Sequence, residues 1–244
     1  MSEQTTPEKR SDDSAGDDGG GGFRRVWKEW IKPFLMVLIV VGSLRSAVAD
    51  WNDVPTGSMR PTILEGERIF VNKLAYDLKV PFTRIRVAEW GAPNRGDVVV
   101  LYSPADGKRL VKRVVGVPGD LLEMRNNRLT VNGETAEYQA FDPEDRTALG
   151  LDGEPDEVVE WETVDSFTHP VTWTPYQPAQ RYLGPLRVPD GKYWVMGDNR
   201  DNSKDSRSFG VVDRELIVGR ATAVVVSFQT WHDPRWDRFF LGLP

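Results

Sequence analysis

One uncharged segment near the N-terminus limits how this chain can fold. It runs from Pro33 to Leu44, contains eight consecutive apolar residues, and follows a basic cluster made of Arg24, Arg25, Lys28 and Lys32. A helix over residues 33–49 would be about 26 Å long, slightly shorter than the roughly 30 Å hydrocarbon core of a bilayer. The segment therefore predicts a membrane anchor at residues 23–50, or a cleavable signal peptide ending at Ala47-Val48-Ala49. A buried core helix is the third and least favoured interpretation.

The composition excludes several classes of protein. Of the 244 residues, 39% are hydrophobic and 28% are charged, which argues against a protein with many membrane spans. The absence of cysteine excludes disulfides, thiolate metal sites and cysteine nucleophiles. Only His169 and His232 could supply an imidazole. The net charge of −6 argues against nucleic acid as a partner.

The rest of the chain divides by composition. Residues 1–22 form an acidic, glycine-rich tail for which we expect no structure. Short runs rich in β-branched and aromatic residues, separated by Gly, Pro and Asn turns, predict strands at 98–102, 110–117, 193–196 and 221–228. We expect a mainly β fold, with one antiparallel β-sheet domain (51–121 and 189–228) and one N-terminal transmembrane helix. Residues 122–188 have weaker periodicity and predict an inserted smaller lobe or a set of long loops, and residues 229–244 a C-terminal tail.

Ser58 is a candidate nucleophile because of its neighbours. Gly57 precedes it and Pro61 follows, so the backbone can approach a substrate closely and leave in a fixed direction. The same composition is typical of an ordinary turn, in which the serine has no chemical role. A serine hydroxyl is a poor nucleophile unless a base accepts its proton.

Lysine is the natural base in a chain with so little histidine, and Lys112 is the strongest candidate. Strand alternation places it between Leu110 and Val114 on one face of a predicted strand. Burial there would disfavour the ammonium form and lower the pKa of the lysine. The alternative is a lysine at a strand edge whose ammonium reaches water.

Residues 197–207 are eleven consecutive small, polar or charged residues after an apolar strand. Aspartate and arginine at this density can build a bidentate network that fixes a site. A calcium loop is not expected, because Arg200 would occupy a ligand position and no glutamate stands at the twelfth place. The sequence predicts no metal site and no cofactor.

Four ordered segments resemble bacterial type I signal peptidases, which are membrane-bound serine–lysine endopeptidases. They are Ser58-Met59-Arg60-Pro61-Thr62-Ile63, then Arg95-Gly96-Asp97-Val98-Val99, then residues 111–120 (VKRVVGVPGD), and finally residues 196–207 (MGDNRDNSKDSR). The resemblance covers residues 54–120 and 188–210 and extends to the anchor. The tail, the insert at 122–188 and the C-terminal stretch lie outside it.

The resemblance implies a role for each matching residue. Ser58 would be the nucleophile and Lys112 the general base, with Ser203 beside Lys112 to orient its amine. The oxyanion hole would combine the Ser58 backbone N–H with the hydroxyl of Thr56, a position where the family commonly has serine. A supporting network would consist of Arg113, Asp198, Arg200, Asp205 and Arg207. Shallow substrate pockets would be lined by Val54, Leu110 and Val111.

The resemblance also implies an activity and a location. The enzyme would remove signal peptides from exported preproteins after small residues, as a monomer, without metal, cofactor or nucleic acid. It would cross the bacterial cytoplasmic (inner) membrane once, with its N-terminus in the cytoplasm and its catalytic domain outside. Ser58 lies nine residues beyond Ala49, at most about 30 Å away, which favours a retained anchor.

Other functions stay open beside this one. A dedicated peptidase that matures one substrate, such as a pilin, would share the same residues. A non-catalytic, membrane-tethered β domain that binds exported peptides would share everything except the dyad. A self-cleaving repressor is disfavoured, because residues 1–50 offer no DNA-binding head.

Overall fold

The computed structural model describes residues 27–244 except 84, 143, 145–155 and 231. The prediction of an unstructured tail at residues 1–22 therefore lies outside the described residues. The chain separates into two compact units, residues 1–43 and 44–244.

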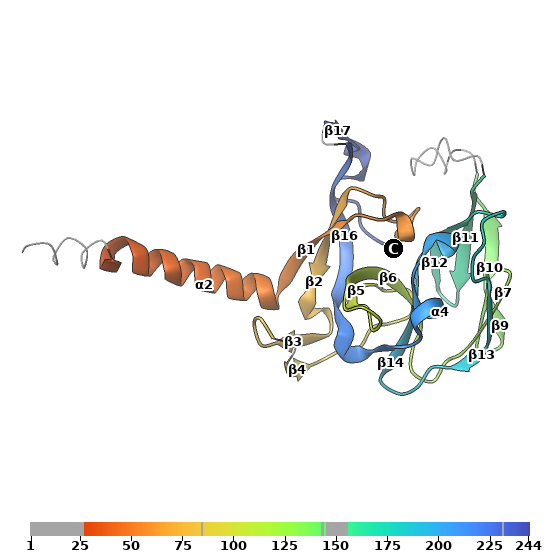
Figure 1. Ribbon diagram of the computed structural model, residues 1–244, viewed down its shortest axis with the longest axis horizontal. Helices are drawn as coiled ribbons and strands as arrows, with labels where there is room; N and C mark the ends of the chain where they lie inside the picture. The colour runs from red at the N-terminus through yellow and green to blue at the C-terminus, as the bar shows by residue number, and fades with distance from the viewer. Residues whose placement is uncertain (1–26, 84, 143, 145–155, 231) are drawn as a thin grey trace, which may run out of the picture. The chain divides into compact units, whose positions relative to one another are not determined.

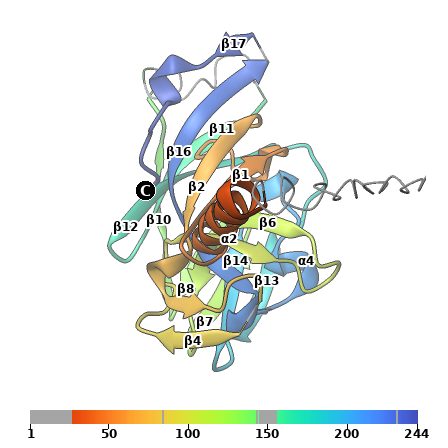
Figure 2. The ribbon, with the colours of Figure 1, turned by 90° about the vertical axis from the view of Figure 1, so that its left-hand side faces the viewer.

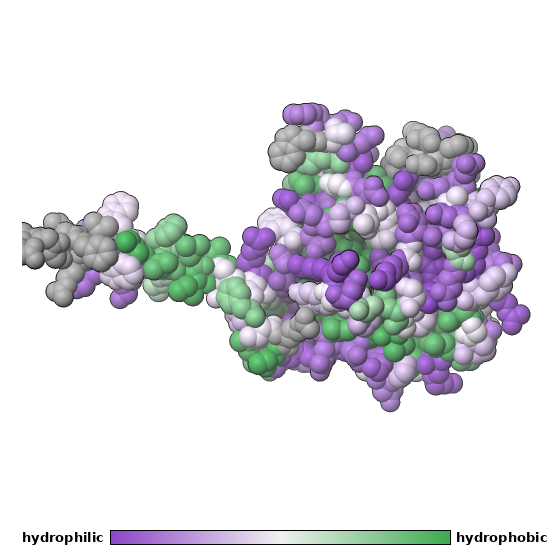
Figure 3. Space-filling view, in the orientation of Figure 1, coloured by the Kyte–Doolittle hydropathy of each residue, from purple (hydrophilic) through white to green (hydrophobic). Residues whose placement is uncertain are grey.

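The N-terminal apolar segment is helical. A short π-helical turn at Trp27–Ile31 leads into α2, which spans Lys32–Ala47. Residues 27–47 are long and apolar enough to cross a membrane, by length and composition. Apolar residues gather along this helix in Figure 3, whereas the β unit is mostly hydrophilic on the face shown. The expected N-terminal helix is confirmed, and its retention as an anchor stays a prediction.

The second unit is built around one antiparallel sheet, which confirms the mainly β prediction (Figure 1). Its strands follow the order β1-β2-β16-β5-β6-β14-β15, and β17 pairs with β16. Their bounds are β1 Ala49–Val54, β2 Glu67–Asn72, β5 Val98–Tyr102, β6 Arg109–Gly116, β14 Lys192–Met196, β15 Val212–Asp213, β16 Ile217–Thr230 and β17 Asp233–Pro234. Each strand predicted from a β-branched run is present. Figure 2 shows β1, β2 and the long β16 side by side.

A hairpin of β3 (Asp77–Lys79) and β4 (Arg86–Glu89) lies outside the large sheet. It exposes five large apolar side chains, namely Val80, Phe82, Ile85, Val87 and Trp90.

The core of the unit holds the segment that follows β1. Met59 and Ile63 are fully buried and belong to one apolar cluster with β-branched residues of four strands: Ile69, Val71, Val98, Val100, Val111 and Val224. At roughly 25 cal/mol per Å² of buried apolar surface, each such side chain contributes about 2 kcal/mol. The turn that carries Ser58 is therefore fixed to the sheet from its C-terminal side.

The insert at 122–188 is a lobe of strands. A four-stranded sheet has the order β13-β7-β8-β9 and a three-stranded sheet the order β10-β11-β12. The bounds are β7 Leu121–Arg125, β8 Arg128–Val131, β9 Glu134–Thr135, β10 Glu137–Ala140, β11 Val158–Val164, β12 Phe167–Trp173 and β13 Tyr182–Arg187. This lobe lies on the side of the unit away from β1 and β2 (Figure 1). The described residues of this segment thus form strands rather than long loops, and its bounds as a separate lobe stay a prediction.

The C-terminal segment packs back onto the sheet. Arg238 is buried and forms an ion pair with Glu67 at 2.5 Å. Leu243 packs against the core cluster, and its N–H donates to the Thr222 carbonyl at 3.0 Å. These residues therefore belong to the β unit in space.

Candidate active site

Ser58 stands on a tight turn. A 3₁₀ turn at Gly57–Met59 follows β1, and Ser58 is half-buried there between two buried neighbours. A Cβ on Gly57 would lie 3.0 Å from Glu65 Oε1, closer than side chains normally pack. A side chain at position 57 would therefore press on the side chains of Glu65 and Arg60.

The amine of Lys112 contacts this hydroxyl. Lys112 lies on β6, an interior strand between β5 and β14, and is 2% exposed. Its Nζ is 2.5 Å from Ser58 Oγ and 2.9 Å from the carbonyl oxygen of Val111. The alternative of a lysine at a strand edge, with its ammonium in water, is wrong.

Burial changes the acidity of Lys112. Removal from water lowers its pKa to about 8. The negative charges of Asp205 and Asp198 oppose this shift, and the positive charge of Arg207 adds to it. A useful fraction of the amine is then neutral near neutral pH and can accept a proton. In this arrangement the Lys112 amine is able to accept the proton of the Ser58 hydroxyl as its oxygen attacks a carbonyl.

A buried ion pair joins Arg113, which follows Lys112 on β6, to Asp198. Arg113 binds Asp198 in a bidentate fashion, with its Nε 2.9 Å from Oδ1 and an Nη 2.8 Å from Oδ2. Asp198 also accepts a hydrogen bond from Thr62 Oγ1 at 2.5 Å, and Arg113 donates to the Gly96 carbonyl at 2.8 Å. These contacts join four of the segments around the dyad, and each charge is both paired and hydrogen-bonded, as burial demands.

Asp205 and Arg207 form a second pair. Arg207 donates to both carboxylate oxygens, at 2.9 and 2.7 Å, and Gly197 N–H donates to Oδ2 at 3.0 Å. Burial raises the pKa of Asp205, but the hydrogen bonds and charge of Arg207 outweigh it and hold the pKa below its ordinary value. The carboxylate stays charged and caps the short helix α4 (Ser206–Phe209).

Comparison with known proteins identifies the family. Residues 27–226 match the family model described as signal peptidase, peptidase S26. A signal peptidase I of Pseudomonas fluorescens is 36% identical over 223 residues, which cover 85% of this chain and 74% of the relative. The chain belongs to the signal peptidase family. It is therefore a peptidase of the kind that removes signal peptides.

Further relatives carry the same name. A signal peptidase I of Pseudomonas aeruginosa is also 36% identical, with the same coverage. A signal peptidase I P of Bacillus subtilis subsp. natto is 35% identical over 196 residues, which cover 78% of this chain and 84% of the relative. The similarity thus reaches relatives from more than one genus.

The role that the resemblance to signal peptidases implies for Ser203, orientation of the Lys112 amine, stays a prediction. The Ser203 hydroxyl is buried, and no hydrogen bond joins it to Lys112. It packs against Gly197, where an added Cβ would lie 2.3 Å from Ser203 Oγ, and it helps to lower the pKa of Asp205. Its position is thus beside the Asp205 pair.

Arg200 contacts a residue outside the signal peptidase motif. It pairs with Glu162 on β11, in the insert, rather than with an aspartate of its own loop. The sequence could not single out Glu162, because the insert contains many acidic residues and no motif marks this one.

The remaining predicted residues divide into two groups. Thr56 is exposed and extended at the start of the turn, and its side chain makes no cap hydrogen bond there. Val54 and Val111 lie together in the core cluster, whereas Leu110 packs against a different cluster that contains Val114. The structure therefore brings two of the three predicted pocket residues together.

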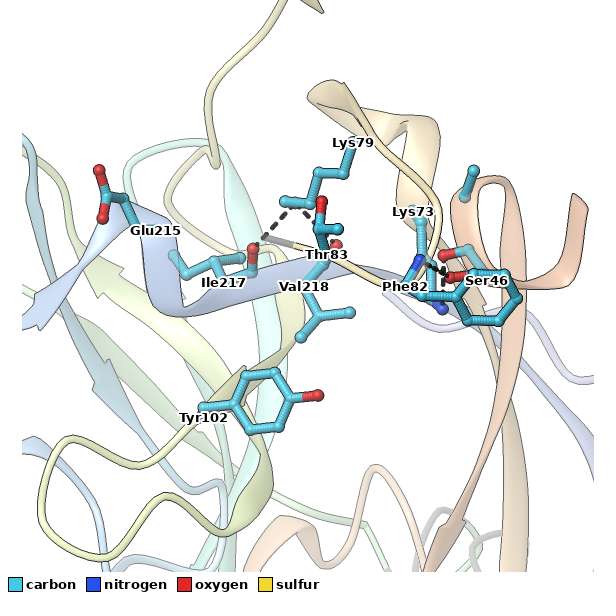
Figure 4. Close-up of a pocket in the computed structure, with 10 residues that line it drawn as sticks. Ser46, Lys73, Lys79, Phe82, Thr83, Tyr102, Glu215, Ile217 and Val218 are labelled. Carbon is cyan, nitrogen blue, oxygen red and sulfur yellow. Dashed lines mark hydrogen bonds between the residues drawn. The ribbon is translucent and has the colours of Figure 1, made fainter. Parts of the chain in front are cut away.

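A cavity of about 400 Å³ lies elsewhere in this signal peptidase (Figure 4). Two lysines line it, and both have acidic partners: Lys73 contacts Asp50 at 3.3 Å, and Lys79 contacts Asp77 at 2.7 Å. Neither Ser58 nor Lys112 belongs to its lining. The cavity is thus separate from the candidate active site.

Proposed function

We propose that this chain is a membrane-anchored signal peptidase I in which Ser58 is the nucleophile and Lys112 the general base. One observation carries the proposal, namely the 2.5 Å between Lys112 Nζ and Ser58 Oγ at a buried amine. General-base catalysis requires this contact and a pKa near the working pH.

The reaction follows from this geometry. Neutral Lys112 accepts the hydroxyl proton as Ser58 Oγ attacks the scissile carbonyl of a preprotein. The oxyanion binds the backbone N–H of Ser58 and the hydroxyl of Thr56, and each donor is worth about 3 kcal/mol in the transition state. The Lys112 ammonium then protonates the leaving amine, and water hydrolyses the acyl-enzyme. Six supporting residues would hold the segments around Ser58 and Lys112: Arg113, Asp198, Arg200, Ser203, Asp205 and Arg207.

The substrate would bind as an extended strand. β1 is the edge strand of the large sheet and ends at Val54, four residues before Ser58. A peptide that pairs with this edge reaches the nucleophile, and apolar contacts with Val54, Leu110 and Val111 would favour small residues before the cut. Substrates are thus exported preproteins with signal peptides.

The location follows from the N-terminal charge pattern. Residues 23–50 would be a retained, single-pass anchor in the cytoplasmic membrane, with the N-terminus inside because basic residues precede the apolar segment. The catalytic domain would act outside the membrane as a monomer. It would consist of residues 51–121 and 189–228, with the insert at 122–188 and the tail at 229–244.

Substitution of the dyad tests the mechanism. Ser58→Ala and Lys112→Ala should each lower preprotein cleavage in detergent by at least about 10³-fold, since the two groups act as one unit. Lys108→Ala is the matched control, because this lysine precedes the same strand and is 77% exposed. Cleavage by either dyad variant within tenfold of the unsubstituted enzyme would overturn the mechanism. Absence of cleavage by the unsubstituted protein would instead favour a peptide-binding β domain.

The same assay gives two further readouts. The kcat/KM of the unsubstituted enzyme should rise with pH and level off above an apparent pKa near 8, well below the ordinary lysine value of about 10.4. Cleavage of several unrelated preproteins separates a general signal peptidase from a peptidase dedicated to one pilin-like substrate.

A further inference from the structure

The insert holds the loop that supports the dyad. Arg200 and Glu162 are both almost completely buried, with Arg200 Nη1 2.9 Å from Glu162 Oε2 and a second contact beside it. Asp201, the next residue, accepts hydrogen bonds from two side chains of the insert: Arg181 at 2.6 Å and Asn127 at 3.0 Å. A bidentate guanidinium–carboxylate pair fixes direction as well as distance. The lobe therefore sets the position of residues 200–201.

A short chain of backbone contacts continues to the nucleophile. Thr172 N–H, on β12 of the insert, donates to the Asp198 carbonyl at 2.9 Å. One residue further, Asn199 N–H donates to the carbonyl of Ser58 at 3.1 Å. Two hydrogen bonds thus connect a strand of the insert to the backbone of Ser58.

Glu162 accepts hydrogen bonds from more than one neighbour. Tyr138 on β10 donates its hydroxyl to Glu162 Oε2. His169 on β12 lies between two carboxylates, 3.4 Å from Glu162 and 3.8 Å from Asp198, and burial holds its pKa well below the ordinary value. A neutral imidazole leaves Arg200 as the cation that balances Glu162.

We propose that Glu162 is a positioning residue for peptide-bond cleavage. Through Arg200 it holds residues 198–199 at the place from which Asn199 fixes the carbonyl of Ser58, and so sets the direction of the Ser58 hydroxyl. Glu162 touches neither substrate nor dyad, and its effect passes through the loop. A displacement of about 1 Å in a reacting group can cost about 100-fold in rate. This proposal rests on the proposed function of Ser58 and Lys112.

The first test compares two glutamates of one strand. Glu162→Gln removes the charge that faces Arg200. Glu160→Gln is the matched control, because Glu160 lies two residues earlier on β11 and pairs with Arg128 of the insert instead. We expect kcat of Glu162→Gln to fall between about 10- and 100-fold with KM within about twofold, and Glu160→Gln to stay within twofold in both.

A double variant separates positioning from stability. Glu162→Gln leaves a buried guanidinium without its charge partner and lowers stability, whereas Glu162→Gln with Arg200→Met removes both charges. We expect the thermal midpoint of the double variant to return toward that of the unsubstituted enzyme while kcat stays low. The apparent pKa of the base should stay near 8, because Lys112 and its charged neighbours are intact.

Two outcomes would overturn the inference: cleavage by Glu162→Gln equal to that of Glu160→Gln, or recovery of kcat together with the midpoint in the double variant. If Glu162→Gln yields no folded protein, the double variant alone decides. Failure of the proposed function is a different result, since it requires the unsubstituted enzyme to be inactive or Ser58→Ala to cleave.

Discussion

The direct contacts of the Lys112 amine are a hydroxyl and a backbone carbonyl, and no carboxylate of the described residues forms an ion pair with it. Lys79 shows the ordinary arrangement, in which a partly buried ammonium contacts a carboxylate, Asp77. For Lys112, removal from water is the largest influence on the pKa, and the aspartates act only through space. The lysine is therefore placed at a cost in stability.

This cost gives a prediction at the scale of one residue. Lys112→Met keeps the length of the side chain and removes the amine, so it should abolish cleavage and raise the free energy of unfolding at pH 7. With a pKa near 8 in the folded state and about 10.4 in the unfolded state, the gain is on the order of 3 kcal/mol.

The pH dependence gives the sign of this effect. Below pH 8 both states carry the proton, and the full cost of burying the ammonium is present. Between pH 8 and about 10.4 the unfolded state binds more protons, so the stability of the lysine protein rises with pH. Urea denaturation at pH 7 and pH 10 measures the difference in the free energy of unfolding between Lys112→Met and the unsubstituted protein. This difference should be smaller at pH 10. A methionine variant that is less stable than the lysine protein at pH 7 would contradict it.

At the scale of elements, Gly197 connects β14 to the loop after it. A Cβ at this position would lie 2.4 Å from the Ser58 carbonyl and 2.3 Å from Ser203 Oγ. Gly197→Ala must therefore push the loop away from Ser58. We expect kcat to fall about 10- to 100-fold and stability to fall by about 1–3 kcal/mol.

Gly184 on β13 provides the matched control for this substitution, because a Cβ there would meet no atom within 4 Å. Gly184→Ala should leave cleavage unchanged. Steady-state kinetics and thermal denaturation of both variants check the prediction, and equal activities would contradict the close approach of residue 197 to Ser58.

The sequence predicted the strands of the large sheet better than those of the insert. β5 and β14 are rich in β-branched and aromatic residues, and β6 contains three valines, because neighbouring strands and the core cover them. β11 and β12 instead bury Glu162, His169 and Thr172. Polar residues at buried positions remove the alternation that identifies a strand, so the same region gave no clear pattern.

The candidate site divides in the same way. Ser58 and Lys112 could be singled out by their local surroundings and proposed as nucleophile and base from their chemistry. Their contact could not be derived from the sequence, because 54 positions separate them. The partner of Arg200 could not be found, because pairing across an insert depends on the fold of both segments. The neighbour of the Ser203 hydroxyl could not be predicted either, since a rotation about one side-chain bond decides which group it meets.

At the scale of the whole molecule, the absence of cysteine offers a direct test of topology. Single cysteines can be placed at Ser11→Cys, before the basic cluster, and at Asp190→Cys, on an exposed turn before β14. A membrane-impermeant maleimide should label residue 190 in intact spheroplasts and residue 11 only after lysis, because basic flanks stay in the cytoplasm. The cysteine-free chain reports background labelling, and the reverse pattern would contradict the predicted orientation.

The contact between the insert and the catalytic loop limits how this chain can diverge. A descendant with a shortened lobe would leave the guanidinium of Arg200 without its acidic partner. It would also leave Asp201 without its hydrogen-bond donors. Such a lineage would have to change positions 200 and 201 together with the deletion, or acquire a replacement acid from another segment. Among homologues, the residue at 162 should therefore covary with the residue at 200, even though one belongs to the shared motif and the other does not.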